Sequence, residues 1–434
     1  MKYLLPIAII LSIVIIAFCI FTMLPSQEAV PPIQEQKVLH LLWCPENNWE
    51  GFEEFLKLYE EKTGYKVEIQ YFPAVEYDTV LRIKMQSGDG PDIFRTENTS
   101  VTENIWPAEW YYDLSDRDWT GRLTPAGREA ISLKNGMIAQ VPLTAISARG
   151  LLYNRDVLLA SGVETLPKTW DEFIVTCQRV KAAGYLPVNI QAASDNEFGT
   201  LQFLTSAWQG IYEAYGETGS ADLMNQVTEN KLRYSQIPQI RQGVEQLLEL
   251  KKLDLINDDY LATTMEVTAR RITNGECAFV VGGDWVLAAA PESLQNANLG
   301  MMPLPLGDMQ NYLVATSGIG IAVNANSPEL EAALEFIDLW CSAQWQEENQ
   351  LYNPGISIFS DVESNKRSYS DDITFWTEQD RCKGIVVNSS GVFPEMDCRV
   401  LMQPLLEGTL SVDDFLKELD RLTDVNAKNL GLTQ

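Results

Sequence analysis

Residues 38–72 read VLHLLWCPENNWEGFEEFLKLYEEKTGYKVEIQYF, and their pattern decides the fold class. VLHLLW is a continuous apolar run of strand length. GFEEFLKLYEEKTG repeats apolar residues at helical spacing, and Gly64 predicts the end of that helix. KVEIQYF then alternates apolar and polar residues, as a second strand does. A strand, a helix and a strand in this order predict parallel strands covered by helices.

The same alternation continues along the rest of the chain. EYDTVLRIKMQSGDG predicts a helix and PDIF a third strand, in which Asp92 caps or terminates the strand. Thr169 and Glu172 form a capping-box pattern before FIVTCQRVKAAG. Further helices are predicted at 240–253, after Ser327 and after Ser411. A chain of 434 residues is too long for one ordinary core, so we expect two α/β lobes with a ligand cleft between them.

Composition narrows the class of partner. The chain has 60 acidic and 32 basic residues and a net charge of -28. Nucleic-acid binding normally requires a basic patch, so we expect no nucleic-acid partner. The one histidine, His40, lies in an apolar run and favours a core or strand-end position. Phosphate-loop, zinc-protease and nucleophile-elbow motifs are missing, and SGIGI (317–321) is too short for a dinucleotide fingerprint. We therefore predict no cofactor, no metal and no catalytic residue.

The amino-terminal sequence predicts a membrane anchor or an export signal. Residues 1–24 carry one charge, Lys2, and an apolar stretch long enough to span a bilayer. Ile16-Ala17-Phe18-Cys19 resembles a lipobox, which makes Cys19 a lipidation candidate, although Phe18 is bulky and the sequence after Cys19 stays apolar. An uncleaved anchor, a lipoprotein and simple secretion remain open, and each places the body outside the cytoplasmic membrane. Residues 25–37 are then a polar tether.

The seven cysteines show no metal-binding spacing. Cys382 and Cys398 are candidates for a bridge across a late loop in an oxidising exterior. For most of the others, the interpretation is that they are small buried hydrophobic residues.

Several segments, in order, resemble one known family. The chain is similar to the extracellular solute-binding proteins of ABC importers, specifically the carbohydrate-binding group that resembles maltose-binding protein. The resemblance covers about residues 38 to 422 and rests on these segments: QSGDGPDIF, VPLTAISARGLLYNRDVLLASGV, LPKTWDEF, FVVGGDW, MMPLP, SGIGIAVNANSPELEAALEFIDLW and LLEGTLSVDDFLKEL.

The resemblance implies a two-lobed periplasmic-binding-protein-like fold of type II. Lobe 1 is expected to comprise 38–147 plus 308–350, and lobe 2 to comprise 148–307 plus 351–434. It also implies a receptor that captures a mono- or oligosaccharide by hinge closure. Its partners would be the ligand, the transmembrane permease subunits and, through the amino terminus, the membrane.

FVVGGDWVLAAA (279–290) places a tryptophan directly after two glycines and an acid. In the family, a tryptophan in this place commonly stacks on a sugar ring, whose apolar C–H face suits a flat aromatic surface. Trp285 is therefore the predicted platform. Gly282 and Gly283 would let the backbone and Asp284 approach the ligand.

Loops after strand ends supply the other candidates, because the fold would bring them to the cleft. The predicted ligand-binding residues are Trp285, Asp284, Trp43, Glu46, Asn47, Arg95, Glu97, Asn98, Arg149, Asp195, Trp208 and Gly355. The positive charges of Arg95 and Arg149 keep a uronate or another anionic sugar open as the ligand.

Three alternatives remain open. The same fold could bind a non-sugar solute such as a polyamine, a small anion or iron. An extracellular carbohydrate-active enzyme would need two carboxylates across a cleft, which the sequence does not mark. A sensory receptor would share this sequence and differ only in its partner.

Overall fold

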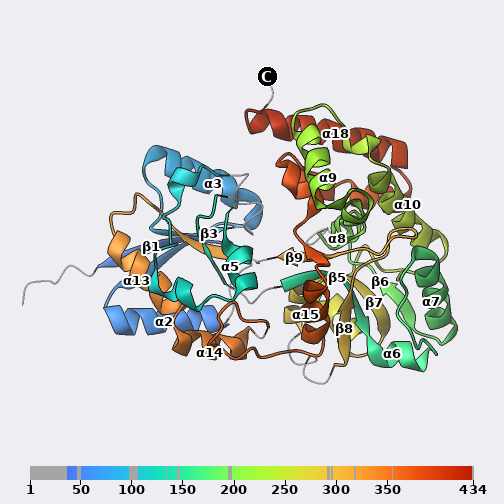
Figure 1. The fold of residues 1–434 in the computed structure, drawn as a ribbon, viewed down its shortest axis with the longest axis horizontal. Helices are drawn as coiled ribbons and strands as arrows, with labels where there is room; N and C mark the ends of the chain where they lie inside the picture. Colours follow the sequence, from blue (N-terminus) through green and yellow to red (C-terminus); the bar gives the residue numbers. More distant parts are fainter. Residues whose placement is uncertain are drawn as a thin grey trace, which may run out of the picture.

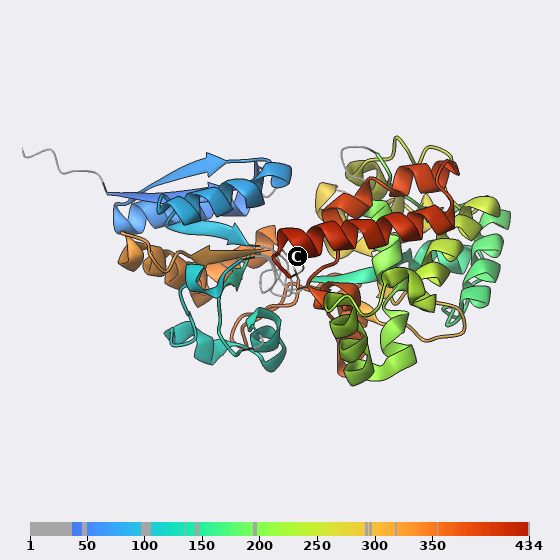
Figure 2. The same cartoon turned by 90° about the horizontal axis from the view of Figure 1, so that it is seen from above.

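The computed structural model describes residues 37–45, 50–96, 106–133, 135–143, 147–193, 198–290, 294, 297–316, 319–353 and 355–432. Within these residues the chain forms two α/β lobes, each with its own sheet, that lie side by side along the long axis (Figure 1). The lobes remain separate when the molecule is turned by 90° (Figure 2). The predicted two-lobed α/β architecture is confirmed.

The sheet of lobe 1 is mixed. Its strands, in spatial order, are β2 (Lys66–Tyr71), β1 (Val38–Trp43), β3 (Ile93–Thr96), β10 (Gly320–Val323) and β4 (Val141–Pro142). β1 pairs in parallel with β2 and β3, as the opening stretch of sequence predicts, and β10 runs antiparallel to β3 and β4. His40 lies in β1 with its side chain exposed, and its N–H donates to Asp92 Oδ2 over 2.7 Å.

Helices cover this sheet because their apolar residues recur at helical spacing. They are α2 (Glu50–Thr63), α3 (Ala74–Ser87), α5 (Pro125–Ile131), α13 (Leu330–Trp340) and α14 (Ala343–Tyr352), with 3-10 turns η2 (Ala108–Trp110) and η3 (Asp118–Arg122). Phe55 of α2 is fully buried, and its ring meets Phe336 and Trp340 edge-on, with centroids 4.8 Å apart in each case. The apolar face of this helix is therefore its packing face.

The sheet of lobe 2 is built around β5, whose residues are all buried. The spatial order is β11 (Cys382–Lys383), β9 (Leu313–Thr316), β5 (Ser147–Asn154), β7 (Cys277–Gly283) and β6 (Leu186–Asn189), and β8 (Leu299–Met302) also pairs with β5. β5 runs antiparallel to β7, β8 and β9, whereas β6 and β7 are parallel.

The helices of lobe 2 surround this sheet (Figure 1). They are α6 (Arg155–Ala160), α7 (Trp170–Ala182), α8 (Phe198–Ala207), α9 (Gly210–Thr228), α10 (Pro238–Lys252), α11 (Met265–Thr273), α15 (Ser370–Glu378), α16 (Glu395–Arg399), α17 (Met402–Glu407) and α18 (Val412–Asn429). Shorter 3-10 turns are η4 (Tyr234–Gln236), η5 (Asp284–Ala289) and η6 (Val386–Ser390).

The predicted cap of α7 is half right. Thr169 Oγ1 accepts the N–H of Glu172 over 3.3 Å, as the capping box requires. The Glu172 carboxylate accepts the N–H of Lys168 over 2.7 Å, one residue before the position that the capping box predicts. Both bonds satisfy backbone donors at the start of the helix.

The chain passes between the lobes at places that differ from the predicted boundaries. β9 belongs to the lobe 2 sheet, so the return to lobe 1 falls after Thr316 and not at 308. Ile358, Phe359 and Val362 pack in the lobe 1 core, so the final passage follows Val362 and not 350. These boundaries were wrong because the apolar pattern of a short strand does not specify which sheet the strand joins.

Cys382 and Cys398 are both free thiols, so the suggested bridge is wrong. Cys398 is buried and Cys382 is partly buried, and burial raises the pKa of each thiol to about 12. In the part of the chain that the structure describes, no helix is long and apolar enough to cross a membrane. Residues 1–36, which hold Cys19 and the predicted anchor, lie outside that part.

Candidate functional site

Trp285 follows the buried strand β7 and lies against the backbone of Gly283. A Cβ added to Gly283 would lie 1.9, 2.1 and 2.2 Å from three atoms of the indole ring, so a side chain there would displace the ring. The φ of Gly283 is -99°, which any residue adopts, so the requirement is space. We predicted that this glycine lets the backbone approach a ligand; in the structure it makes room for Trp285.

A pocket opens beside Trp285 and holds about 320 Å³ of space, including solvent at its mouth. Its lining comes from lobe 2 alone: Asn189, Gln191, Gly199, Gln202, Met265, Thr268, Val280, Val281, Gly282, Trp285 and Val286. The partly exposed Trp285 supplies the aromatic surface. Amides and one hydroxyl supply the polar surface. Among the described residues, no charged side chain lines this pocket.

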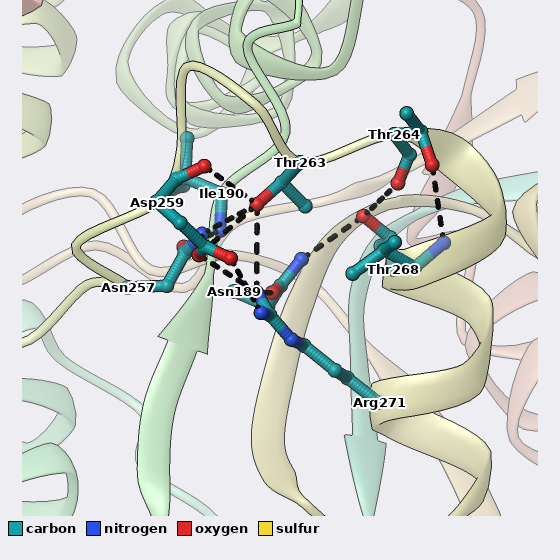
Figure 3. Close-up of polar contacts among 9 residues, drawn as sticks. Asn189, Ile190, Asn257, Asp259, Thr263, Thr264, Thr268 and Arg271 are labelled. Atoms are coloured by element: carbon teal, nitrogen blue, oxygen red, sulfur yellow. Dashed lines mark hydrogen bonds and ion pairs between the residues drawn. The ribbon is translucent and has the colours of Figure 1, made fainter.

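Asn189 stands at the end of β6 and is fixed by a polar network (Figure 3). Arg271 Nη1 donates to Asn189 Oδ1 over 2.9 Å, and Asn189 Nδ2 donates to Thr268 Oγ1 over 3.0 Å. Thr268 in turn donates to the carbonyl of Thr264 over 2.9 Å. Both ends of the Asn189 amide are therefore occupied inside the protein.

Arg271 is held in place by Asp259 (Figure 3). Its two terminal nitrogens donate to the two oxygens of the carboxylate over 3.0 and 2.7 Å. Asn257 Nδ2 also donates to Asp259, over 2.8 Å. The hydrogen bond from Arg271 is the main cause that lowers the pKa of Asp259 below its usual range. The network ties α11 to the loop that holds Asn257 and Asp259.

Arg149 is buried and lies one residue away from the pocket. Its Nη1 donates to Oε1 of Gln202, which lines the pocket, whereas Arg149 itself does not. Burial lowers the pKa of the guanidinium to about 10, and the charge of Glu395 partly opposes this shift. The group is therefore still protonated at neutral pH. Its Nε and Nη2 have no hydrogen-bond partner among the residues that the structure describes.

Asp284 directly follows β7 and is not part of the pocket lining. Ser147 and Ala148, where the chain enters lobe 2, favour its ionised form. Burial outweighs this effect and raises the pKa of Asp284 to about 6.

The predictions that Trp43 and Trp208 bind the ligand are wrong. Trp43 is fully buried in the lobe 1 core, where it stacks on Phe52 with centroids 4.3 Å apart. Trp208 is fully buried in the lobe 2 core, and its Nε1 donates to the carbonyl of Ile240 over 3.1 Å. Neither ring has an exposed face on which a ligand could stack.

The remaining candidates lie elsewhere or outside the described residues. Arg95 is buried at the end of β3, with its guanidinium 5.5 Å from the centre of the Tyr77 ring. Gly355 is buried after α14, and its N–H donates to Gln350 Oε1 over 3.3 Å. Neither lines the pocket. The candidates that fall outside the described residues are Glu46, Asn47, Glu97, Asn98 and Asp195.

Sequence reasoning predicted none of the amide and hydroxyl side chains that line the pocket. Asn189 and Gln191 end the strand segment LPVNIQ, and Gln202 interrupts the apolar run TLQFLTSAW. A polar residue inside an apolar run is the signal that could have found them, because a buried amide needs partners. Within the described residues, no cluster of three or more His, Cys, Asp or Glu side chains is placed to hold a metal ion.

Comparison with known proteins finds relatives that are described as sugar-binding proteins. The chain is 22% identical over 293 residues to the multiple sugar-binding protein of Streptococcus mutans, which covers 65% of this chain and 66% of that protein. It is 25% identical over 281 residues to the melibiose/raffinose/stachyose-binding protein MelE of Bacillus subtilis, covering 62% and 61%. The chain thus spans just under two thirds of the length of these curated relatives.

Solved structures share the fold. A chitin oligosaccharide binding protein superposes with a TM-score of 0.74 at 17% identity, covering 91% of this chain and 99% of that one. The solute-binding protein RafE in complex with raffinose gives 0.72 at 18% identity, covering 90% and 99%. The family described as bacterial extracellular solute-binding protein matches residues 47–347. The chain belongs to this bacterial extracellular solute-binding protein family.

Proposed function

We propose that this protein is the extracellular receptor of a carbohydrate ABC importer and that it captures a mono- or oligosaccharide. The observation that carries the proposal is the pocket beside Trp285, which amides and apolar side chains line and which, among the described residues, no charged side chain lines. An indole face suits the C–H face of a pyranose, and amides suit its hydroxyls. The sugar-binding names of the relatives support the same ligand class.

Capture works by closure of the two lobes. The pocket is built from lobe 2, so a ligand would bind there first. Lobe 1 then contributes contacts that exist only in the closed state, and those contacts shift the equilibrium toward closure. The closed, loaded receptor delivers its sugar to a membrane permease, and no covalent bond changes.

Residues 1–24 hold the receptor at the outer face of the cytoplasmic membrane, either through lipidated Cys19 or as an uncleaved helix.

The pocket argues against the two main alternatives. A polyamine site needs carboxylates around the cationic ligand, and none lines this pocket among the described residues. A glycoside hydrolase needs two carboxylates that flank the scissile bond, and the described lining offers no such pair. Turnover of a glycoside would overturn the receptor proposal.

The test is a thermal-shift and tryptophan-fluorescence screen of the full chain in detergent. The panel contains mono- and oligosaccharides, polyamines and metal ions. A sugar at a hundred times its dissociation constant is expected to add about 2.7 kcal/mol to the free energy of unfolding. We expect Trp285→Ala to abolish the fluorescence change and to weaken binding about tenfold or more, since the aromatic contact area is lost.

Tyr215→Ala is the matched control, because Tyr215 is an exposed aromatic residue on α9 outside the pocket. It should bind as the wild type does. A response to polyamines alone would keep the fold and discard the carbohydrate assignment.

A further inference from the structure

Gln202 connects the pocket to a buried arginine. It lies on α8, its side chain lines the pocket, and it is 2% exposed. Its Oε1 accepts a hydrogen bond from Nη1 of Arg149, which comes from β5. Arg149 is also 2% exposed and does not line the pocket. The two residues therefore form a pair in which Gln202, and not Arg149, lines the pocket.

Arginine chemistry fixes which end of the amide faces Arg149. A guanidinium carries only N–H donors and no acceptor. The reversed Gln202 amide would set its own N–H donors against those of Arg149, and both would be buried without an acceptor. The Gln202 oxygen must therefore face Arg149, so the NH₂ group turns away from it.

That NH₂ group lacks an acceptor. Gln202 Nε2 is buried and has no hydrogen-bond partner among the residues that the structure describes. Asn189 provides an internal comparison on the same wall. Arg271 faces its oxygen in the same way, but its Nδ2 already donates to Thr268 (Figure 3). An arginine faces the oxygen of both amides, but only the NH₂ group of Gln202, of these two, lacks a hydrogen-bond acceptor among the described residues.

We propose that Arg149 is a positioning residue that orients Gln202, so that the pocket presents an amide N–H donor which an acceptor oxygen of the ligand satisfies. The inference rests on the proposed function. For a sugar, that acceptor is a ring oxygen, a glycosidic oxygen, or a hydroxyl whose own hydrogen is donated elsewhere. Arg149 then selects the ligand through Gln202 and without touching it.

Substituting Gln202→Glu separates binding from folding. The new carboxylate keeps an oxygen toward Arg149 and adds an ion pair, so the melting temperature should be unchanged or higher. The group facing the ligand becomes an acceptor oxygen in place of an N–H donor. We expect about tenfold or greater loss of sugar affinity by titration calorimetry, because two acceptors then face each other. A purely structural role for Gln202 would move stability and affinity in the same direction.

The matched control is Gln226→Glu. Gln226 is exposed on α9, outside the pocket, and the substitution makes the same change of charge. Its sugar affinity should equal that of the wild type.

A double-mutant cycle tests whether Arg149 acts through Gln202. Arg149→Met frees the Gln202 amide to reverse, so it should weaken sugar binding several-fold in the wild-type background. It should have no further effect in a Gln202→Met background. Additive losses would mean that Arg149 contacts the ligand itself, and would overturn the positioning role.

The outcomes separate the two proposals. The probe is whichever of raffinose, melibiose, stachyose and chitobiose binds the wild-type full chain most tightly. Wild-type binding together with unchanged affinity in Gln202→Glu would overturn this inference and leave the proposed function standing. If the wild type bound no mono- or oligosaccharide in the thermal-shift and fluorescence screen, both proposals would be overturned.

Discussion

At the scale of single residues, the site depends on the contact between Gly283 and Trp285. Gly283→Ala should displace the indole, since the added Cβ would lie 1.9 Å from a ring atom. The φ of -99° suits alanine, so backbone strain would not contribute. We expect about tenfold weaker sugar binding, measured by calorimetry, and a changed tryptophan emission.

Gly121→Ala is the control for that substitution. An added Cβ at Gly121 would meet nothing within 4 Å, and this residue lies in η3 of lobe 1. Its sugar affinity should match that of the wild type. Unchanged binding in Gly283→Ala would mean that the position of the ring does not matter to the ligand.

Individual residues also mark the limit of sequence reasoning about the site. The position of Trp285 after a small-residue strand end could be predicted, because the pattern is local. Trp208 could not be rejected from sequence, since its burial depends on contacts with Ile240 and Phe393, which are distant in the chain. Gln202 was missed for the same reason: its partner Arg149 comes from another element.

At the scale of elements, helices with a periodic sequence could be predicted, whereas the sheet that a short strand joins could not. α10 spans Pro238–Lys252, close to the predicted 240–253, because its apolar residues repeat over several turns. β9 (Leu313–Thr316) was placed in the wrong lobe, because its strand pattern is compatible with either sheet. Long helices carry their packing face in their own sequence, whereas short strands obtain their place from pairing.

The element-scale prediction concerns the tie between α11 and the loop that holds Asp259. Asp259→Asn removes the carboxylate that holds both terminal nitrogens of Arg271. The free energy of unfolding at pH 7, measured by urea denaturation, should fall by about 1 kcal/mol, the scale of a partly exposed ion pair. The folded-state pKa of Asp259 is lowered, so this contribution is present above its unfolded pKa of about 4. It should be lost progressively as the pH falls below about 4.

Glu266→Gln is the matched control on the same helix. Glu266 pairs with Arg270 across one turn, and both side chains are more than half exposed. Exposed pairs of this kind contribute little, so stability should change by less than about 0.5 kcal/mol. Equal losses of stability in the two variants would mean that the Asp259–Arg271 pair stabilises the fold no more than an exposed ion pair does.

At the scale of the whole molecule, Asp284 lies where the lobes are joined. Ser147, at the first passage into lobe 2, favours its ionised form. Burial raises the pKa of Tyr369, which packs in lobe 2 after the last passage, and the charge of Asp284 adds to that shift. Burial raises the pKa of Asp284 itself to about 6. The ionised carboxylate is thus unfavourable at the junction between the lobes.

The sign of the resulting pH dependence follows from linkage. The unfolded pKa of an aspartate is about 3.9, so between pH 4 and 6 the folded state binds more protons at Asp284 than the unfolded state does. This group should therefore make the melting temperature rise as the pH falls from about 7 to about 4.5. The net charge of -28 acts in the same direction, because acid reduces repulsion among carboxylates.

Asp284→Asn isolates the contribution of Asp284 to this pH dependence, since it removes one titrating group and leaves the others. The melting temperature of the variant should rise less steeply over this range than that of the wild type. Identical slopes in the two proteins would show that Asp284 is not protonated at the lobe junction in this range.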